Sequence, residues 1–262
     1  MEIWQAFVLG IVEGLTEFLP ISSTFHLIFA GKLLNIEPSN FLKFFEVFIQ
    51  AGAILAVLFL YGKELWQNRK LDKNIILSFI PTAILGFLLH SVIKNFFFET
   101  DWLMISAFVI VGLIFIVYEQ WHKKHPSKEK NIADLTWQQA ILIGIGQAFA
   151  TLPGVSRAGA VILTMMILGQ KRSESAKYSF LLALPTTCAA AGYDALKLIG
   201  QNPISAQEFF LIIVGFVTAF VSAFFVLKWF IAYLQKHTLT SFGIYRLIVA
   251  GFLLITFGPT IF

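Results

Sequence analysis

Charged residues are scarce in this sequence, and cysteine is nearly absent. Asp, Glu, Lys and Arg together make up 13% of the 262 residues, whereas soluble domains contain about 25%. This scarcity, with 58% hydrophobic residues and a mean hydropathy of +0.79, excludes an ordinary soluble domain and predicts an all-α polytopic membrane protein. The single cysteine, Cys188, excludes a disulfide framework and a dithiol redox pair. Thiols and histidines form no cluster in the sequence, so a transition-metal site is not expected.

The excess of positive charge lies in short loops and not in one basic domain. The net charge is +4, and lysine and arginine gather in segments 63–74 and 122–134, between long apolar runs. Basic loops of this kind orient a membrane protein with those loops on the cytoplasmic side. We therefore expect the lipid bilayer, and no nucleic acid, as a partner.

Several apolar runs are long enough to cross a bilayer as helices, since about 20 apolar residues suffice. The six predicted spans are residues 41–62, 75–94, 102–121, 175–199, 207–233 and 243–261. Two further apolar regions, 3–34 and 137–170, are each broken by a proline and a polar cluster into halves too short to cross. Broken backbone at membrane depth is tolerated only where protein or a water-filled cavity surrounds it. Each of these two regions is therefore predicted to form a re-entrant helical hairpin.

The two broken regions also indicate an internal repeat of inverted topology. The loop charges make the first hairpin enter from the outside and the second from the cytoplasm. A shift of 134 residues aligns Glu13 with Gln147, Glu17 with Thr151, Ser22 with Ser156 and Ser23 with Arg157. We therefore predict one membrane domain made of two inverted repeats, 1–134 and 135–262, each with a hairpin and three spans. In such duplicated folds the breaks meet near the middle of the membrane and form the site.

Two carboxylates precede the first break. Glu13 and Glu17 are four residues apart, so they share one face of a helix. Ionisable residues at membrane depth are costly and mostly serve a site or a pathway. The pair offers hard oxygen ligands, which suit Mg²⁺ or Ca²⁺. Two alternatives stay open: Glu17 pairs permanently with a basic residue, and Glu13 caps the hairpin or supports the site from behind.

Hydroxyl groups and a histidine follow Pro20, which ends the first helix. Ser22, Ser23 and Thr24 are favoured N-caps for a second short helix, and the free amides of a helix N-terminus bind anions. Ser23 and His26 are three residues apart, so a hydroxyl nucleophile and a base can meet one turn apart. For Ser22 we favour the capping role, and the alternative for His26 is a hydrogen bond to the backbone.

The second break carries a guanidinium in an otherwise apolar hairpin. Arg157 is costly there unless it is paired, so it either binds a carboxylate of the first break or contacts a phosphate with two hydrogen bonds. Gly154 lets the backbone approach a ligand closely, and Ser156 of the same break is assigned to phosphate binding. Glu46 and Gln50, four residues apart in the first span, either line the same cavity or pack between helices.

Three motifs in the chain match the pattern of a known family. They are Glu13-Gly14-Leu15-Thr16-Glu17-Phe18-Leu19-Pro20-Ile21-Ser22-Ser23-Thr24 with His26, Phe45-Glu46-Val47 with Gln50, and Pro153-Gly154-Val155-Ser156-Arg157. The chain resembles, over its whole length, the undecaprenyl-diphosphate phosphatase (bacitracin-resistance) family. The resemblance implies removal of the terminal phosphate of undecaprenyl diphosphate, which recycles the lipid carrier of bacterial cell-wall synthesis. It also implies a divalent cation, Mg²⁺ or Ca²⁺, and a place in the bacterial inner membrane, and the loop charges open the site toward the outer face.

Roles for individual residues follow from the motifs and the resemblance together. The predicted catalytic residues are Glu17, Ser23, His26 and Arg157. The predicted phosphate-binding residues are Ser22, Thr24, Gly154, Ser156 and Arg157, and the predicted metal ligands are Glu13 and Glu17. The sequence departs from the family pattern at Phe25, where the family has glycine, and at Ala158 and Val161, where it has hydroxyl-bearing residues.

Two other classes of protein share part of this pattern. A transporter or flippase of an isoprenyl-phosphate lipid would use the same inverted-repeat cavity to carry the head group across without cleaving it. A purely structural membrane scaffold would leave the polar groups at depth without a purpose, so we rank it last. For the enzyme, the expected partners are a polyprenyl diphosphate lipid and the bilayer, and a second copy of the chain is a candidate partner in a homodimer.

Overall fold

The computed structural model of the chain is built from helices. It describes residues 1–97, 100–125, 129–198 and 204–261, of which 89–97, 194–198 and 257–261 are described by their backbone alone. Within these ranges there are ten α-helices, two short 3-10 helices and no β-strand. In chain order the elements are α1 (Ile3–Thr16), α2 (Ser23–Leu33), α3 (Asn40–Gln67), α4 (Arg69–Phe97), α5 (Asp101–Lys124), η1 (Ile132–Asp134), α6 (Trp137–Ala148), η2 (Phe149–Thr151), α7 (Arg157–Ile167), α8 (Arg172–Leu198), α9 (Ala206–Leu234) and α10 (Thr240–Ile261).

Long apolar helices confirm the predicted class of an all-α polytopic membrane protein. Four of them are long and apolar enough to cross a membrane, namely α3, α4 over Arg69–Leu88, α5 and α9. The other two predicted spans, 175–199 and 243–261, fall in α8 and α10. α8 has a proline within it, and the described side chains of α10 extend only over Thr240–Thr256. Residue 199 of the first of these spans lies outside the described residues.

Two pairs of short helices occupy the broken regions of the sequence. α1 packs against α2, and α6 packs against α7. The four helices have 14, 11, 12 and 11 residues in chain order. At about 1.5 Å per residue none of them reaches the roughly 30 Å thickness of the hydrocarbon core. Both predicted hairpins, 3–34 and 137–170, are therefore present as broken helix pairs.

The two broken pairs are built alike. Ser22 and Ser156 both have positive φ, at 66° and 79°, and each is the N-cap of an 11-residue helix. α1 packs along α9, and α6 packs along α4. Each contact is close because it is made over a glycine: a Cβ at Gly10 would lie 2.6 Å from a carbonyl oxygen of α9, and one at Gly144 would lie 2.2 Å from a carbonyl oxygen of α4. The division of the chain into two repeats stays a prediction.

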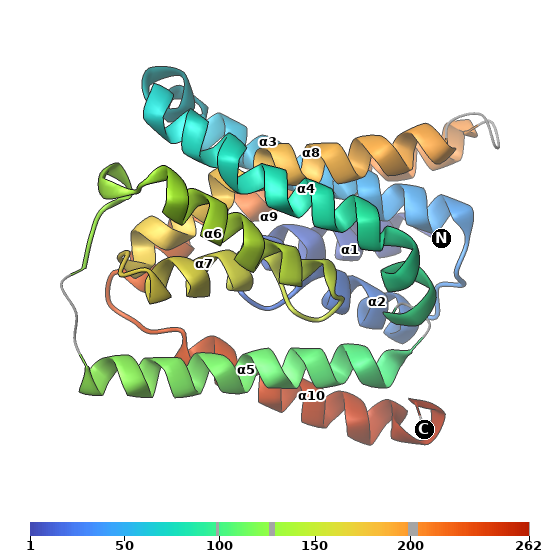
Figure 1. The fold of residues 1–262 in the computed structure, drawn as a ribbon. Helices are drawn as coiled ribbons and strands as arrows, with labels where there is room; N and C mark the ends of the chain where they lie inside the picture. The colour runs from blue at the N-terminus through green and yellow to red at the C-terminus, as the bar shows by residue number, and fades with distance from the viewer. Residues whose placement is uncertain (98–99, 126–128, 199–203, 262) are drawn as a thin grey trace.

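The remaining helices enclose the short pairs (Figure 1). α5 and α10 run side by side along one edge of the molecule, while α3, α4 and α8 lie on the opposite side. The α5–α10 pair joins α2 through a cluster of buried apolar side chains, namely Phe25, Phe29, Met104, Ile105, Phe108, Ala250 and Leu253. Pro20 and Gly154, one from each break, are both buried. The breaks therefore lie inside the protein, where irregular backbone is tolerated at membrane depth.

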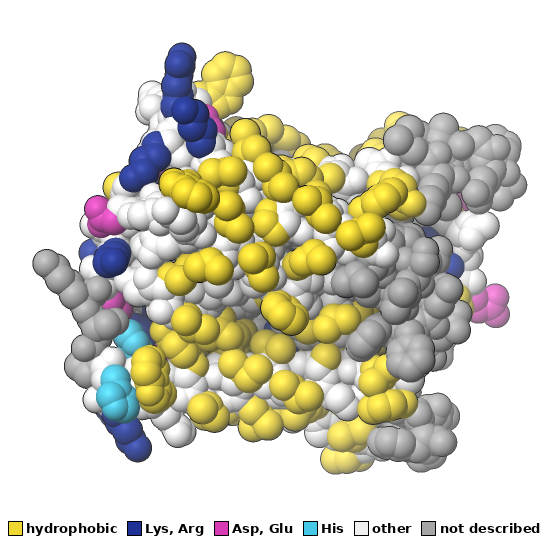
Figure 2. Space-filling view, in the orientation of Figure 1, with side chains coloured by type: hydrophobic (Ala, Val, Ile, Leu, Met, Phe, Trp, Pro, Cys, Tyr) yellow, Lys and Arg dark blue, Asp and Glu magenta, His cyan; other side chains and the backbone are white. Residues whose placement is uncertain are grey.

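The surface separates apolar from basic side chains. Hydrophobic side chains cover the middle of the face shown in Figure 2, and Lys and Arg side chains gather at one end. Figure 1 places the α3–α4 turn and the C-terminal end of α5 at that same end. The basic segments 63–74 and 122–134 meet there, since Lys70 Nζ donates a hydrogen bond of 2.5 Å to Ala133 O. Both basic loops thus lie on one side, as their predicted common orientation requires, and which side of the membrane this is stays a prediction.

Candidate active site

A cavity of about 200 Å³ lies where the two breaks meet. Side chains and backbone from both short pairs, from α3 and from α8 line it: Glu17, Ser22, Ser23, Thr24, Gln50, Ala150, Thr151, Leu152, Pro153, Gly154, Ser156, Arg157, Thr186, Thr187 and Ala190. Most of the predicted site residues are in this set. Glu13, His26 and Glu46 are not.

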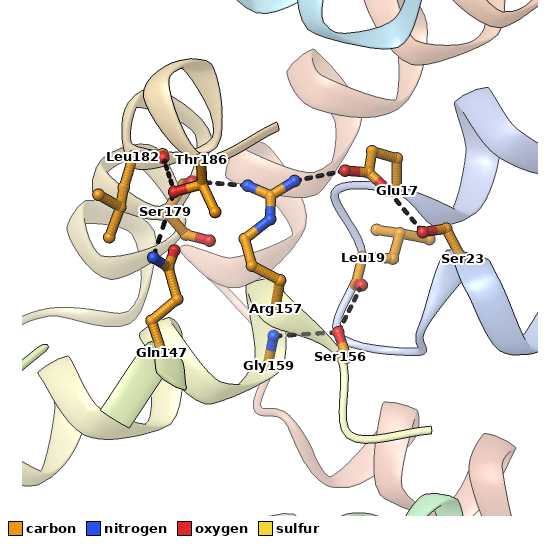
Figure 3. A network of polar contacts seen from close by, with 10 residues as sticks. All are labelled: Glu17, Leu19, Ser23, Gln147, Ser156, Arg157, Gly159, Ser179, Leu182 and Thr186. Carbon is orange, nitrogen blue, oxygen red and sulfur yellow. Dashed lines mark hydrogen bonds and ion pairs between the residues drawn. The ribbon is translucent and has the colours of Figure 1, made fainter. Parts of the chain in front are cut away.

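A guanidinium, a carboxylate and a hydroxyl form a continuous chain along one wall (Figure 3). Arg157 Nη2 donates to Glu17 Oε1 at 2.5 Å, and Ser23 Oγ donates to Glu17 Oε2 at 2.5 Å. Arg157 Nη1 also donates to Ser179 O on α8 at 3.2 Å. Both partners of the ion pair are largely shielded from solvent, with side chains 14% and 8% exposed. The first break thus contributes the carboxylate and the hydroxyl, and the second contributes the cation.

The N-termini of α2 and α7 both border the cavity. Ser22, Ser23 and Thr24 line it at the start of α2, and Ser156 and Arg157 line it at the start of α7. The first amides of an α-helix have no partners within the helix, so each N-terminus offers donors and a partial positive charge to an anion. The cavity therefore suits a ligand with more than one negatively charged group.

Backbone strain marks the residue before each of these helices. A positive φ is uncommon for a residue with a side chain and is often found at functional sites. Ser156 Oγ accepts a hydrogen bond from Gly159 N at 3.1 Å and donates to Leu19 O at 3.4 Å, so it caps α7 and links the two breaks. Gly154 has φ +93°, and a Cβ there would lie 2.4 Å from Met104 O, so only glycine fits.

The two predicted metal ligands are placed differently. Glu17 lines the cavity, whereas Glu13 lies one turn earlier on α1, is fully buried and is absent from the cavity wall. Neither carboxylate oxygen of Glu13 has a hydrogen-bond partner within the described part of the chain. An orphaned buried carboxylate beside a second carboxylate is the hard oxygen donor set that Mg²⁺ or Ca²⁺ prefers. The described residues bring together no group of three or more Asp, Glu, His or Cys side chains that could hold a metal without further ligands.

His26 is not hydrogen-bonded to Ser23. Its Nδ1 lies 2.8 Å from Ser22 O, and its Nε2 lies 2.8 Å from the hydroxyl of Tyr245 on α10. Because a carbonyl only accepts, Nδ1 carries the proton, and in a neutral ring Nε2 then accepts from the tyrosine hydroxyl. The hydrogen bond from Ser23 goes to Glu17 instead. The catalytic role of His26 stays a prediction.

Several polar residues at or near the cavity were missing from the predicted set, among them Thr186, Thr187 and Arg246. Thr186 and Thr187 line the wall from α8, directly after the helix-interior Pro185. Arg246 on α10 is fully buried and donates to backbone carbonyls of both breaks. A charged residue in a predicted span, and two threonines after a proline in another, are the signals that could have identified them.

The three departures from the family pattern lie outside the cavity wall. Phe25 stacks on Phe108 of α5, with ring centroids 3.9 Å apart and planes 2° apart. Ala158 and Val161 are at most 1% exposed and belong to the main apolar core. The wall is therefore complete without hydroxyl groups at these positions.

The chain matches known proteins over nearly its whole length. The model of a family described as bacitracin resistance protein BacA matches residues 6–252. A relative from Aquifex aeolicus (strain VF5) named undecaprenyl-diphosphatase is 44% identical over 246 residues, which cover 94% of this chain and 95% of the relative. Relatives of the same name from Persephonella marina and Methanococcus aeolicus are 44% and 38% identical over 257 residues, each covering 98% of this chain and 99% of the relative. The resemblance inferred from the three motifs is confirmed, and the chain belongs to the BacA family of bacitracin resistance proteins.

Proposed function

We propose that this protein is an integral-membrane phosphohydrolase that removes the terminal phosphate of undecaprenyl diphosphate and releases undecaprenyl phosphate. The observation that carries this proposal is the chain of hydrogen bonds from Arg157 through Glu17 to Ser23, which joins both breaks in one cavity. The names of the relatives support the same activity. The product re-enters the lipid-carrier cycle of cell-wall synthesis.

Phosphate binding and proton transfer are coupled through Glu17. A phosphate is a better partner for Arg157 than one carboxylate oxygen, because a guanidinium binds it with two hydrogen bonds. When Arg157 turns to the substrate, Glu17 loses its counter-charge and is left as the nearest proton acceptor of Ser23. Binding of the substrate thereby frees Glu17 to act as a base, whereas in the empty site Arg157 neutralises the charge of Glu17.

Hydrolysis then follows from groups already in place. Either Ser23 attacks the terminal phosphorus and water then hydrolyses the phosphoserine to phosphate, or Ser23 orients a water that attacks directly; in both cases Glu17 accepts the proton of the attacking group and loses it when the products leave. Undecaprenyl phosphate leaves, and the amides at the two helix N-termini and Arg157 stabilise the charge on the transferred group. For His26 to accept the proton instead, its ring must first leave Ser22 O and Tyr245.

A divalent cation, Mg²⁺ or Ca²⁺, is the proposed cofactor. Glu13 and Glu17 would hold it, with substrate oxygens and water as the other ligands, as is usual for Mg²⁺ at phosphate sites. When bound, it neutralises charge on the diphosphate. The unpaired buried oxygens of Glu13 support this assignment.

The apolar surface of the protein indicates where the lipid substrate would lie. The apolar helices place the protein in a membrane, and we assign it to the bacterial inner membrane with the cavity open to the outer face. The isoprenoid tail would lie against apolar helices while the diphosphate enters the cavity. Assembly into a homodimer stays a prediction, and no observation favours the transporter alternative over hydrolysis.

Phosphate release by purified protein in detergent tests the proposal, because detergent leaves no second compartment for transport. We expect cation-dependent release from undecaprenyl diphosphate and loss of about 1000-fold in kcat/KM for Glu17→Gln. Glu64→Gln is a matched control, since Glu64 also pairs with a cation, Lys177, at 2.5 Å. Release from Glu17→Gln equal to that from the control would contradict the assigned site, and vesicle transport without any release would contradict the function.

A further inference from the structure

Arg246 is a fully buried cation that no carboxylate neutralises within the described residues. Every one of its recorded hydrogen bonds goes to a backbone carbonyl. Nε donates to Pro20 O at 2.9 Å, Nη1 to Gly154 O at 2.9 Å and to Phe108 O at 3.2 Å, and Nη2 to Val155 O at 2.9 Å. A buried charge is costly unless hydrogen bonds satisfy it, and these four carbonyls do so.

The four carbonyls come from three separate segments. Pro20 is in the break between α1 and α2, Gly154 and Val155 are in the break between α6 and α7, and Phe108 is on α5. Two further hydrogen bonds join the breaks directly, one of 2.5 Å from Arg157 Nη2 to Glu17 Oε1 and a long one of 3.4 Å from Ser156 Oγ to Leu19 O. The guanidinium of Arg246 therefore bonds to the backbone of both breaks, separately from the side-chain ion pair between Arg157 and Glu17.

The packing around Arg246 leaves room for this arrangement. The aromatic rings of Phe108 and Phe115 lie 4.7 and 5.4 Å from its guanidinium carbon, which stabilises a desolvated cation. On α5, a Cβ at Gly112 would lie 3.0 Å from Arg246 Cβ, so glycine lets α10 approach there. The 134-residue shift that aligns the two breaks pairs Arg246 with Gly112. The first half therefore has no arginine at the equivalent position, and Arg246 bonds to both breaks.

The hydrogen bond to Val155 O also orients the next amide. The described chain has no cis peptide bond, and in a trans peptide the C=O and N–H groups point in opposite directions. The N–H of Ser156, at the start of α7, therefore points away from Arg246. The hydrogen bond from Arg246 therefore holds the carbonyl of Val155 on one side of this peptide. The N–H group on its other side belongs to Ser156, the N-cap of α7, and this residue borders the cavity.

We propose that Arg246 is a positioning residue that holds the N-termini of α2 and α7 at the spacing at which one diphosphate contacts both. It contacts no substrate, and it acts through the backbone of the two breaks. This role rests on the proposed phosphohydrolase function for its effect on rate, but the spacing of the two helices is a property of the protein alone. Lysine cannot replace it fully, because its ammonium has three donors and no planar fork.

Kinetics separate positioning from mere stabilisation. Displacement of reacting groups by about 1 Å costs about 100-fold in rate, so we expect Arg246→Gln to lower kcat/KM about 100-fold and Arg246→Lys about tenfold, both per folded, monodisperse molecule. The matched control is Arg172→Lys, which disturbs the ion pair with Glu119 at the basic end of the molecule. It should lower the melting temperature while keeping kcat/KM within about twofold. If both Arg246 variants lower only the melting temperature, the proposal is wrong.

A distance measurement tests the spacing without any substrate. In a Cys188→Ala background, spin labels at Leu33→Cys and Ile167→Cys report on the exposed far ends of α2 and α7, which are 51% and 62% exposed. We expect one narrow distance distribution for the protein with Arg246 intact, a broadened or shifted one for Arg246→Gln, and no change for Glu64→Gln, whose ion pair with Lys177 touches neither break. Should Arg246→Gln fail to fold, Arg246→Lys decides the matter. Unchanged distributions in the folded variants overturn the proposal, whereas absence of phosphate release from the unsubstituted protein contradicts only the proposed function.

Discussion

The two broken helix pairs have the same backbone and opposite chemistry. Each consists of two short helices separated by a break that ends in a positive-φ serine. At equivalent positions the first pair carries Ser23 and the second carries Arg157. Duplication can supply matched geometry, but an anionic substrate needs a nucleophile on one side and a cation on the other. The difference teaches that two similarly built breaks can meet in one cavity and still bring different side chains to it.

The same contrast holds one turn before the breaks. Glu13 is fully buried and its oxygens have no hydrogen-bond partner in the described residues. Its counterpart Gln147 donates from Nε2 to Thr82 Oγ1 at 2.8 Å and to Thr186 Oγ1 at 3.2 Å. A buried carboxylate without donors needs a proton or a cation, whereas the neutral amide of Gln147 carries no charge and its nitrogen is bonded to two hydroxyls. The proposed cation site therefore involves Glu13 of the first pair and not Gln147 of the second.

The largest expected effect comes from removing the guanidinium of the second pair. Arg157→Lys should lower kcat/KM for undecaprenyl diphosphate about 1000-fold, because an ammonium cannot reproduce the bidentate contact with phosphate. Initial rates of phosphate release measure this, and Arg172→Lys is the control, since Arg172 also pairs with a glutamate through two hydrogen bonds. A loss of kcat/KM smaller than about tenfold would show that the guanidinium of Arg157 is not essential for the reaction.

The hydroxyl of the first pair should come next. We expect Ser23→Ala to lower kcat about 100-fold, because the group that attacks or orients the attacking water is lost. Ser222→Ala is the control, since that hydroxyl bonds only to Thr218 O within α9 at 2.6 Å. Rapid acid quenching with labelled substrate shows whether phosphate is carried on Ser23. Equal rates for the two variants would place the nucleophile elsewhere.

Helix breaks and the need of a buried charge for a partner could be predicted from the sequence. Pro20 and Pro153, each followed by polar residues in an apolar region, predicted both breaks. Arg157 was expected either to pair with Glu13 or Glu17 or to bind a phosphate, because an unpaired guanidinium is costly at membrane depth, and the structure pairs it with Glu17. These predictions needed only helix periodicity, chain-breaking residues and the cost of burying charge.

Contacts between segments far apart in sequence could not be predicted in the same way. The three-residue spacing of Ser23 and His26 allowed a hydrogen bond between them. In the structure Ser23 bonds to Glu17 and His26 bonds to Tyr245 instead. Arg246 contacts both breaks only because α10 packs against α5 beside them. Helix spacing shows which residues share a face, and the packing of the other helices decides what that face meets.

A smaller effect should distinguish Glu13 from its counterpart. Glu13→Gln should raise the Mg²⁺ concentration for half-maximal rate about tenfold, as expected when a ligand or its close support is lost. Gln147→Met should leave the cation requirement unchanged, because the amide of Gln147 bonds to hydroxyls of α4 and α8 and supplies no carboxylate ligand. Rates measured against Mg²⁺ concentration give both values. An unchanged requirement in Glu13→Gln would remove Glu13 from the metal site.

The smallest effect concerns the two strained serines. Ser156→Ala should lower the free energy of unfolding by about 1 kcal/mol, because it removes the N-cap hydrogen bond to Gly159 N. Ser22 makes no such side-chain bond, so Ser22→Ala should cost only about 0.3 kcal/mol. Both substitutions keep a positive φ, so the difference between them largely cancels the strain and reports the loss of the cap together with the long hydrogen bond from Ser156 to Leu19 O. Reversible denaturant titrations in detergent measure it, and equal losses would mean that α7 and α2 begin in the same way despite their different caps.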